Sequence, residues 1–279
     1  MIRDISLIKR IAVAIVFAPL IFWIFLVRGV PLFVFLLIIT VIGQWELFRM
    51  FGKRLGPAHR SVAYAAGLTL LTAAFFDLSS MFAGIIIAAV MAAFIIEIAA
   101  GTDDRFGRVT MTLFASVYPA AFTAYFLRIE AIPTFFLSAY IRYLFVFILV
   151  VIWVFDTASY FAGRMFGRHP FFPKTSPKKT VEGFVGGLAA ATLAGGAIGW
   201  YLNPLLVGNF LVLSVIIALA GQAGDLSESI IKRELGVKDS SNIIPGHGGI
   251  LDRFDSLFFA APAVYCYLFV IRCLTEGCW

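Results

Sequence analysis

The sequence has few charged residues. Only 14% of its 279 residues are Asp, Glu, Lys or Arg, whereas 61% are hydrophobic and the mean hydropathy is +0.97. A soluble domain of this composition would have a largely apolar surface, which excludes a water-soluble globular protein. No alternating strands of the kind that build membrane barrels are visible. We therefore expect an all-α, polytopic membrane helix bundle.

Cysteine is also scarce. Cys266, Cys273 and Cys278 all lie near the end of the chain and have no metal-ligand spacing. Neither a disulfide framework nor a zinc site is expected from this pattern. We expect the three residues to pack in or beside the last apolar segment.

Nine apolar segments are candidate membrane spans. They cover residues 11–27, 30–46, 61–76, 81–100, 109–127, 143–165, 183–202, 205–224 and 256–273. A spanning helix needs about 20 residues, so the ends of the shorter segments are approximate. The first five spans form an N-terminal transmembrane region, residues 1–140. The other four and their polar connections form a C-terminal region, residues 141–279.

The basic residues predict the orientation in the membrane. We place the N-terminus in the cytoplasm and let nine spans alternate. Only four of the 22 Lys and Arg residues then lie on the opposite side: Arg28, Arg128, Arg142 and Arg272. Positive charge accumulates on the cytoplasmic side, so this bias supports both the orientation and the count of nine. The two longest cytoplasmic connections, 166–182 and 225–255, are where chemistry on a soluble anionic substrate is expected.

The connection 225–255 is the most polar part of the chain. Its acidic and basic residues alternate. This suits an anionic ligand held partly by cations and partly by an acid-bound metal, whereas a membrane anchor would need only bases. If the helix of the eighth span continues to Gly236, a residue type that commonly ends helices, four polar residues share one face. These four are Asp225, Glu228, Ser229 and Lys232.

A glycine-rich turn, residues 245–249, leads into the last span. We expect its backbone N–H groups and the N-terminus of the following helix to bind phosphate. Asp252 and Asp255 lie one turn apart at the start of that helix, so two membrane helices would bring Asp225 and Asp252 together. Mg²⁺ usually takes one or two carboxylates plus substrate phosphates. The acids of this connection, Asp225, Glu228, Asp239, Asp252 and Asp255, are therefore the candidate metal ligands.

Plain solvation is the alternative explanation for many charges in these loops. For Lys232 or Glu228 taken singly, it is as good an explanation as a function. Asp225 and Asp252 lie at the ends of apolar spans, where a carboxylate near hydrocarbon is costly and tends to be functional. His247 lies between glycines in the turn and is expected to contact the ligand.

The segment 174–187 is the second candidate region. Its lysines could serve topology alone, but hydroxyl groups stand among them. The residues expected to bind phosphate here are Ser176, Lys178, Lys179 and Thr180. Gly186 and Gly187 should let the seventh span pack closely against a neighbouring helix.

Four acidic residues lie outside these two segments. Asp156 is inside the sixth span, where an acid is a functional candidate by default. Glu46 and Glu97 lie nearer to span ends and are expected to be interfacial. Asp77 is expected in a turn.

These residues carry a resemblance to a known family. The run at 229–255 resembles the signature of the phosphatidate cytidylyltransferases, the CDP-diglyceride synthases, at every position of that signature. Its sequence is SIIKRELGVKDSSNIIPGHGGILDRFD. The runs DTASY at 156–160 and SPKKTVEGF at 176–184 are similar to that family as well. The resemblance covers the C-terminal half of the chain. The N-terminal region, 1–140, is similar only in consisting of apolar spans.

The resemblance implies a reaction, a cofactor and an assembly. Members transfer the cytidylyl group of CTP to phosphatidic acid, giving CDP-diacylglycerol and pyrophosphate, with Mg²⁺ and a second cation. The positions of the two-cation site are occupied here by Asp225 and Asp252. Members are all-helical homodimers in contact with membrane lipid. The resemblance thus implies a catalytic C-terminal region facing the cytoplasm from the inner membrane, and no nucleic-acid partner.

Roles follow for the candidate residues. The catalytic set is Asp225, Asp252, Lys232, Arg233 and His247, with the two aspartates as metal ligands. The other expected substrate contacts are Ser229, Lys238, Asp239, Gly248, Gly249, Arg253, Asp255, Ser176, Lys178, Lys179, Thr180 and Asp156. The lipid phosphate is already a good nucleophile at neutral pH, so no strong general base is needed. Cations must bring two polyanions together and stabilise the leaving pyrophosphate.

Two other functions remain open. A CTP-dependent lipid alcohol kinase would share the helical membrane plan but transfer the γ-phosphoryl group. The full signature through Asp255 favours cytidylyl transfer instead. A transporter would also explain spans and charges. However, transporters place charges near the bilayer midplane and often show inverted repeats, and neither pattern is visible here.

Overall fold

The fold is seen in a computed structural model of the protein. It describes residues 2–55, 58–100, 105–132, 141–244, 246 and 248–276. Within these ranges, the side chains of residues 2–14, 53–55, 141–142 and 276 are not described.

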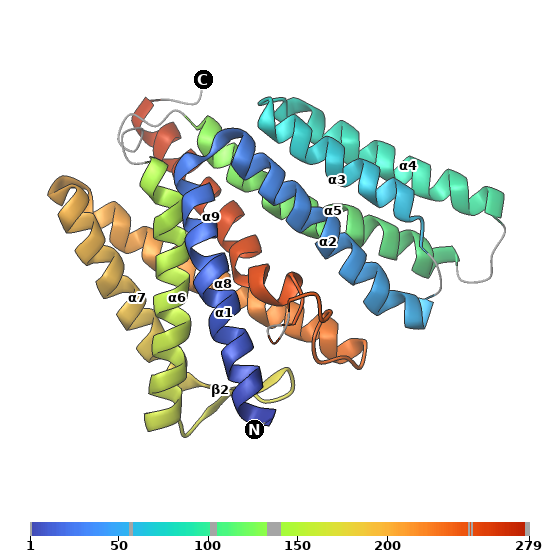
Figure 1. Cartoon of the computed structure of the whole chain (residues 1–279). Helices are drawn as coiled ribbons and strands as arrows, with labels where there is room; N and C mark the ends of the chain where they lie inside the picture. Colours follow the sequence, from blue (N-terminus) through green and yellow to red (C-terminus); the bar gives the residue numbers. More distant parts are fainter. Residues whose placement is uncertain are drawn as a thin grey trace. The chain divides into compact units, whose positions relative to one another are not determined.

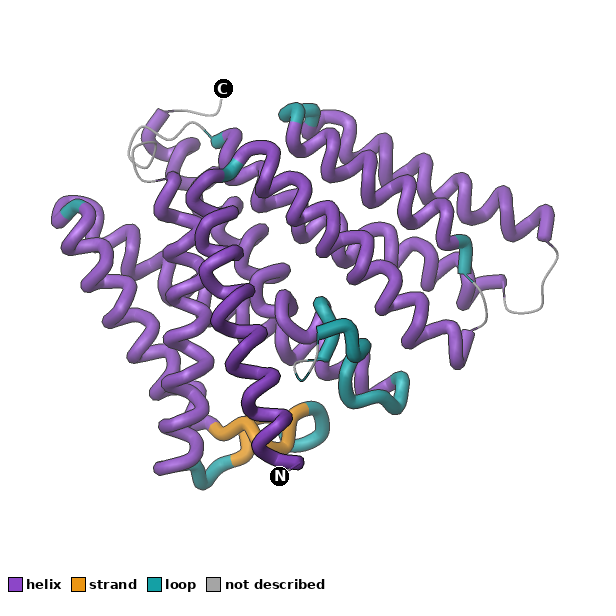
Figure 2. Tube along the Cα trace, in the orientation of Figure 1, coloured by secondary structure: helices purple, strands orange, loops and turns teal. Residues whose placement is uncertain are grey.

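The described part of the chain is almost entirely helical, which confirms the all-α prediction (Figure 1). Its α-helices are α1 (Ile2–Val27), α2 (Gly29–Leu55), α3 (Arg60–Phe75), α4 (Phe82–Ala100), α5 (Arg105–Ala131), α6 (Ile141–Phe166), α7 (Val181–Leu202), α8 (Val207–Glu234) and α9 (Leu251–Glu276). Two short 3₁₀ turns, η1 (Ser79–Met81) and η2 (Pro204–Leu206), precede α4 and α8. A small antiparallel hairpin of β1 (Pro170–Phe172) and β2 (Ser176–Thr180) connects α6 to α7, shown in orange in Figure 2.

The protein is a multi-pass membrane protein. Seven helical stretches in the described residues are long and apolar enough to cross a bilayer: 29–52, 79–100, 105–131, 143–166, 181–202, 204–234 and 251–275. The other two expected spans correspond to α1, whose described apolar part is Ile15–Val27, and to α3, which has 16 residues. A full crossing takes about 20 residues. The count of nine crossings and the cytoplasmic N-terminus therefore stay predictions.

The chain divides into two compact units. The first comprises residues 1–131 and 234–253, and the second comprises 132–233 and 254–279. The segment 234–253, which holds most of the family-like run, thus groups with the N-terminal helices. The polar residues that precede it on α8 belong to the second unit.

Polar groups join the helices of the first unit, in which α2, α3, α4 and α5 pack on one another. The buried Gln44 amide on α2 donates to the carbonyl oxygens of Ala63 (2.8 Å) and Ala115 (3.1 Å). The hydroxyls of Thr40 and Thr123 are 2.7 Å apart. Such interhelical hydrogen bonds stabilise membrane bundles, in which the hydrophobic effect does little to hold helices together.

The sequence led us to expect that Glu46 and Glu97 would be interfacial, but in the structure both are buried. Glu97 is 2% exposed, and its Oε2 lies 2.7 Å from His59 Nε2 and 3.2 Å from Arg108 Nε. Glu46 is fully buried. Both carboxylates find their partners inside the protein, which span position alone does not reveal. Asp77 does lie in a turn, with φ of 58°.

Close helix packing shapes the second unit, as the glycine pair of the seventh span predicted. Along the contact of α6 with α7, a Cβ atom at Gly187 would lie 1.9 Å from Ser159 Oγ and 2.8 Å from the carbonyl oxygen of Phe155. The absence of a side chain is therefore required there. On α9, Cys266 is a free thiol, but Cys273 is disulfide-bonded, so the expectation of no disulfide is wrong for Cys273.

Gly187→Ala is expected to lower the free energy of unfolding by about 1–3 kcal/mol, because the added methyl group overpacks the contact between α6 and α7. Gly208→Ala on α8 is the matched control, since a Cβ there meets no atom within 4 Å. The measurement is the midpoint of thermal unfolding of the purified protein in detergent. Equal midpoints for the two variants would contradict the packing described.

Candidate active site

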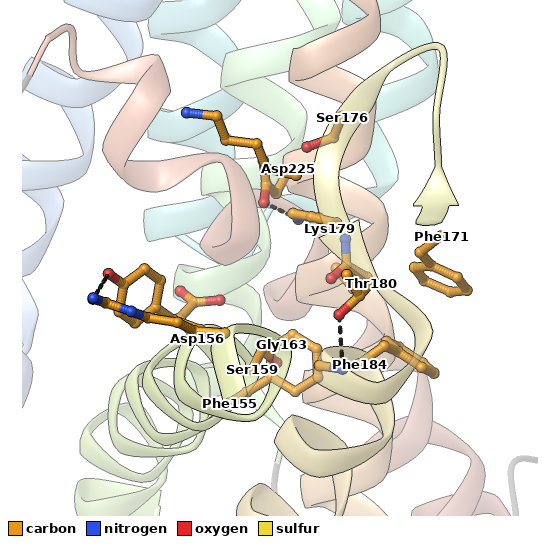
Figure 3. A pocket seen from close by; sticks show the side chains of 15 residues that line it. Phe155, Asp156, Ser159, Gly163, Phe171, Ser176, Lys179, Thr180, Phe184 and Asp225 are labelled. Atoms are coloured by element: carbon orange, nitrogen blue, oxygen red, sulfur yellow. Dashed lines mark hydrogen bonds and ion pairs between the residues drawn. The ribbon is translucent and has the colours of Figure 1, made fainter. Parts of the chain in front are cut away.

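A cavity of about 500 Å³ lies in the second unit, bounded by α6, the hairpin, the start of α7 and α8 (Figure 3). It brings together six residues that the sequence singled out: Asp156, Ser176, Lys178, Lys179, Thr180 and Asp225. These residues come from three separate stretches of the chain. The hairpin segment and α8 thus line one cavity, and their joint role in a binding site stays a prediction.

An ion pair joins two of the cavity's charged residues. Lys179 on β2 points toward Asp225 on α8, and its Nζ pairs with Asp225 Oδ2 (Figure 3). The two side chains are 27% and 33% exposed, so both are accessible from the cavity. Asp225 reaches this place because α8 continues beyond Gly224, as expected, and ends at Glu234 before Gly236 with φ of 64°. The cavity thus holds a cation and a carboxylate side by side.

The hairpin that carries Lys179 is fixed at its ends. Thr180 caps α7, because its Oγ1 accepts a hydrogen bond from Gly183 N at 3.1 Å. Glu182 accepts from the backbone N–H groups of Arg168 (3.0 Å) and His169 (3.3 Å). Arg233 Nε, from the end of α8, donates to the carbonyl oxygen of Thr175 at 3.4 Å. Thr180 and Arg233 therefore help to place the lysines.

Further carboxylates lie near Asp225. Asp156 on α6 is within electrostatic range of Asp225, Asp255 and Lys179. Within the described residues, however, no three His, Cys, Asp or Glu side chains form a group that could hold a metal ion by themselves. A Mg²⁺ that takes one or two carboxylates and completes its shell with substrate phosphates and water needs no such group. The hard oxygen donor of Asp225 at the cavity wall fits that kind of site.

Aromatic residues to which the sequence analysis gave no role line the same cavity. Phe184 on α7 stacks with Phe171 of the hairpin at 4.8 Å between ring centroids, and packs edge-on against Phe155 at 6.1 Å. Tyr160 accepts a hydrogen bond from Arg164 through its hydroxyl, at 3.2 Å. Tyr160 and Phe184 belong to the family-like runs, but no spacing rule separates Phe155 and Phe171 from the many other aromatics of the chain. Their shared place beside the lysines appears only in the tertiary structure.

The first unit holds the other part of the family-like run. Lys238 and Asp239 are exposed and line a smaller cavity of about 250 Å³ together with Arg49 of α2. Arg49 also lies over the ring of Trp45, 5.5 Å from its centroid. Because the basic groups of Lys238 and Arg49 share this cavity, Arg49 is a candidate anion contact that the sequence reading missed.

The carboxylate of Asp252 is held firmly within this unit. Its Oδ2 accepts hydrogen bonds from Ser240 N (2.9 Å), Ser240 Oγ (2.9 Å) and Gly249 N (2.8 Å). The bond from Gly249 ties the first turn of α9 to the backbone that precedes it. Asp252 therefore orders the signature loop in addition to any role with a ligand.

The glycine-rich turn differs from the phosphate cradle that we expected. The N–H of Gly248 donates to the carbonyl oxygen of Ile244 at 3.2 Å, and that of Gly249 donates to Asp252. The N–H groups of Ile250 and Leu251 donate to Glu46 at 2.9 and 2.8 Å. These four groups bind acceptors of the protein itself, so they do not support the cradle. Pro245 and His247 lie outside the described residues.

The remaining predicted residues lie on α8 and at the start of α9. Lys232 forms an ion pair with the buried Glu228 at 3.4 Å, and Ser229 is half-buried on α8. Asp255 is half-buried on α9, and Arg253 is exposed. None of these four predicted contacts is among the residues that line the 500 Å³ cavity. Asp225 belongs to the second unit and Asp252 to the first, so their predicted convergence on one metal stays a prediction.

Comparisons with known proteins give a consistent result. The sequence model of the Cytidylyltransferase family matches residues 8–271. The phosphatidate cytidylyltransferase of Aquifex aeolicus is 42% identical over 175 residues, covering 62% of this chain and 60% of the relative. That of Haemophilus influenzae is 44% identical over 135 residues (46% and 47%), and that of Bacillus subtilis is 40% identical over 168 residues (60% and 60%). The chain thus aligns with about half to 60% of the length of these curated relatives.

Proposed function

The chain belongs to the cytidylyltransferase family, and from this membership we propose that it transfers the cytidylyl group of CTP to phosphatidic acid, giving CDP-diacylglycerol and pyrophosphate. The proteins that it resembles carry the name of this activity. One structural observation carries the proposal. In a membrane-embedded helix bundle, Lys178 and Lys179 stand beside Asp225 in a cavity large enough for a polyphosphate.

The reaction depends more on neutralising the phosphate charges of its two substrates than on proton transfer. An oxygen of the lipid phosphate attacks the α-phosphorus of CTP, the bond from that phosphorus to the bridging oxygen breaks, and pyrophosphate leaves with the bond's electrons. Lys178 and Lys179 are suited to hold the triphosphate, because an ammonium group forms charge-assisted hydrogen bonds to phosphate oxygens. In this proposal, Lys179 leaves Asp225 for the substrate phosphates.

We propose Mg²⁺ and a second cation as cofactors, with Asp225 and Asp252 as the protein ligands. Asp225 lines the cavity, and Oδ2 of Asp252 is held in one orientation by three hydrogen bonds. When bound, the metal would neutralise phosphate charge and stabilise the leaving pyrophosphate.

The location proposed is the cytoplasmic (inner) membrane, with the active site facing the cytoplasm. The basic residues of the loops and the soluble nature of CTP both favour this side. We also propose a homodimer, as the family resemblance implies. Lipid chains of the substrate would stay in the inner leaflet while the phosphate enters the cavity.

Purified protein in detergent is expected to release pyrophosphate from CTP or dCTP when phosphatidic acid and Mg²⁺ are present, and not from ATP. The label of α-³²P-CTP should appear in the lipid product. A lipid alcohol kinase would instead move the γ-label to a lipid alcohol, and a transporter would do neither. Equal use of ATP would contradict the nucleotide assignment, and lipid labelled only from the γ-position would contradict the reaction.

A further inference from the structure

Glu46 on α2 is a fully buried carboxylate whose partners all come from the family-like run. Its Oε1 accepts from Ser241 Oγ (2.5 Å) and Ile250 N (2.9 Å). Its Oε2 accepts from Ser240 Oγ (2.9 Å) and Leu251 N (2.8 Å). These donors lie about 200 residues further along the chain, with sequence separations of 194 to 205.

The carboxylate of Glu46 lies at the N-terminus of α9, where a negative charge is stabilised. The N–H groups of Ile250 and Leu251 are at the start of α9, where backbone donors have no partner within the helix. A negative charge at a helix N-terminus is stabilised by the helix dipole. Burying a carboxylate is costly unless hydrogen bonds compensate. Here Ser241 Oγ, Ile250 N and Leu251 N donate to it, and the single hydroxyl proton of Ser240 is shared between Glu46 and Asp252. The arrangement therefore ties the start of α9 to α2.

Ser240 extends the link to Asp252. Its Oγ lies 2.9 Å from Oε2 of Glu46 and 2.9 Å from Oδ2 of Asp252. Gly249 makes room for this contact, because a Cβ atom there would lie 2.0 Å from Ser240 Oγ and 2.4 Å from Glu46 Oε1. The two carboxylates are thus held through one serine, with a glycine packed against the link.

We propose that Glu46 is a positioning residue, which holds Asp252 in its working orientation through Ser240 and through the first turn of α9. The consequence for catalysis rests on the proposed function, in which Asp252 binds a cation. Glu46 itself touches no substrate. Its role also explains why residue 249 is a glycine, since a Cβ atom there would clash with Ser240 and Glu46.

Glu46→Gln tests the proposal, with Glu97→Gln as the matched control. Both residues are buried carboxylates of the first unit, but Glu97 is bound by His59 and Arg108. In Glu46→Gln an amide NH₂ faces N–H and O–H donors, so backbone hydrogen exchange at residues 249–251 should accelerate by about tenfold or more. The kcat of the folded protein should fall by about tenfold or more, with little change in the KM for CTP. Glu97→Gln should leave exchange at 249–251 and kcat unchanged.

Two neighbouring serines provide a second comparison that does not remove the buried carboxylate. The hydroxyl of Ser240 contacts both Glu46 and Asp252, whereas that of Ser241 donates to Glu46. Ser240→Ala should therefore lower kcat more than Ser241→Ala. This comparison decides the matter if Glu46→Gln does not fold.

The outcomes separate this proposal from the proposed function. Wild-type exchange at 249–251 in Glu46→Gln would overturn the positioning role, whatever reaction the protein performs. Faster exchange with a wild-type kcat, or equal kcat for the two serine variants, would overturn the link to catalysis. A wild-type protein that releases no pyrophosphate from CTP would instead refute the proposed function, and the exchange measurement would still test how Glu46 holds the loop.

Discussion

Asp225→Asn is expected to abolish cytidylyl transfer while leaving the protein folded and inserted in the membrane. Asparagine keeps the shape of the side chain but removes the negative charge that would bind a cation beside the substrate phosphates. Losing such charge stabilisation raises the barrier by several kcal/mol, on the order of a thousandfold in rate or more. The residue is one-third exposed in the cavity wall, so its replacement should disturb packing little.

Glu234→Gln is the matched control for this variant, because it removes an exposed carboxylate from the end of the same helix, outside the cavity. The measurements are pyrophosphate release at saturating Mg²⁺ and elution of the detergent-solubilised protein as a single species. Near-normal turnover by Asp225→Asn would show that Asp225 is not a metal ligand. Asp252→Asn should also be inactive, but it is a less specific test, because Asp252 also accepts hydrogen bonds from the backbone of Ser240 and Gly249.

The double variant Lys178→Gln/Lys179→Gln is expected to lower kcat/KM by well over tenfold. Each lysine lines the cavity, and even one charge-assisted hydrogen bond to phosphate contributes about 1.5–3 kcal/mol. If the lysines served only to keep the loop in the cytoplasm, Arg164, Arg168 and Lys174 would suffice, and the kinetics would not change. The ion pair of Lys179 with Asp225 argues against that simpler role.

Lys174→Gln is the control for the lysine variants, since Lys174 is exposed in the same hairpin and does not line the cavity. Initial rates with labelled CTP, measured over a range of CTP concentrations, give kcat/KM for each variant. Orientation of the loop is checked by the accessibility of an introduced cysteine. Unchanged kinetics with unchanged orientation would mean that Lys178 and Lys179 only keep the loop in the cytoplasm. They would then not bind the substrate phosphates beside Asp225.

The local parts of the site were predictable from the sequence. The face of α8 that carries Asp225, the end of α8 before Gly236 and the start of α9 near Asp252 all follow from helical spacing and residue preferences. So does the close approach of α7 at Gly187. These features depend on residues a few positions apart, whose relative placement is set by the geometry of one helix.

The errors arose where partners are distant in sequence. Glu46 looks interfacial from its position near a span end, yet it is buried by a loop that follows about 200 residues later. The glycine turn looks like a phosphate cradle, yet its N–H groups are used by Asp252 and Glu46. Backbone N–H groups donate to whichever acceptor the fold brings near, and the spacing of residues in the sequence does not identify that acceptor.

By itself, the sequence determined that this is a helical membrane protein, and it predicted a polar, basic face with acidic residues suited to metal and phosphate. Hydropathy and charge decide these properties, because lipid admits only apolar, internally hydrogen-bonded spans. Only the tertiary structure decided which charges meet. It paired Lys179 with Asp225 across 46 residues, gathered Phe155, Phe171 and Phe184 around them, and bound Glu46 to the segment before α9. Such pairings result from helix packing over the whole chain, and no short stretch of sequence contains them.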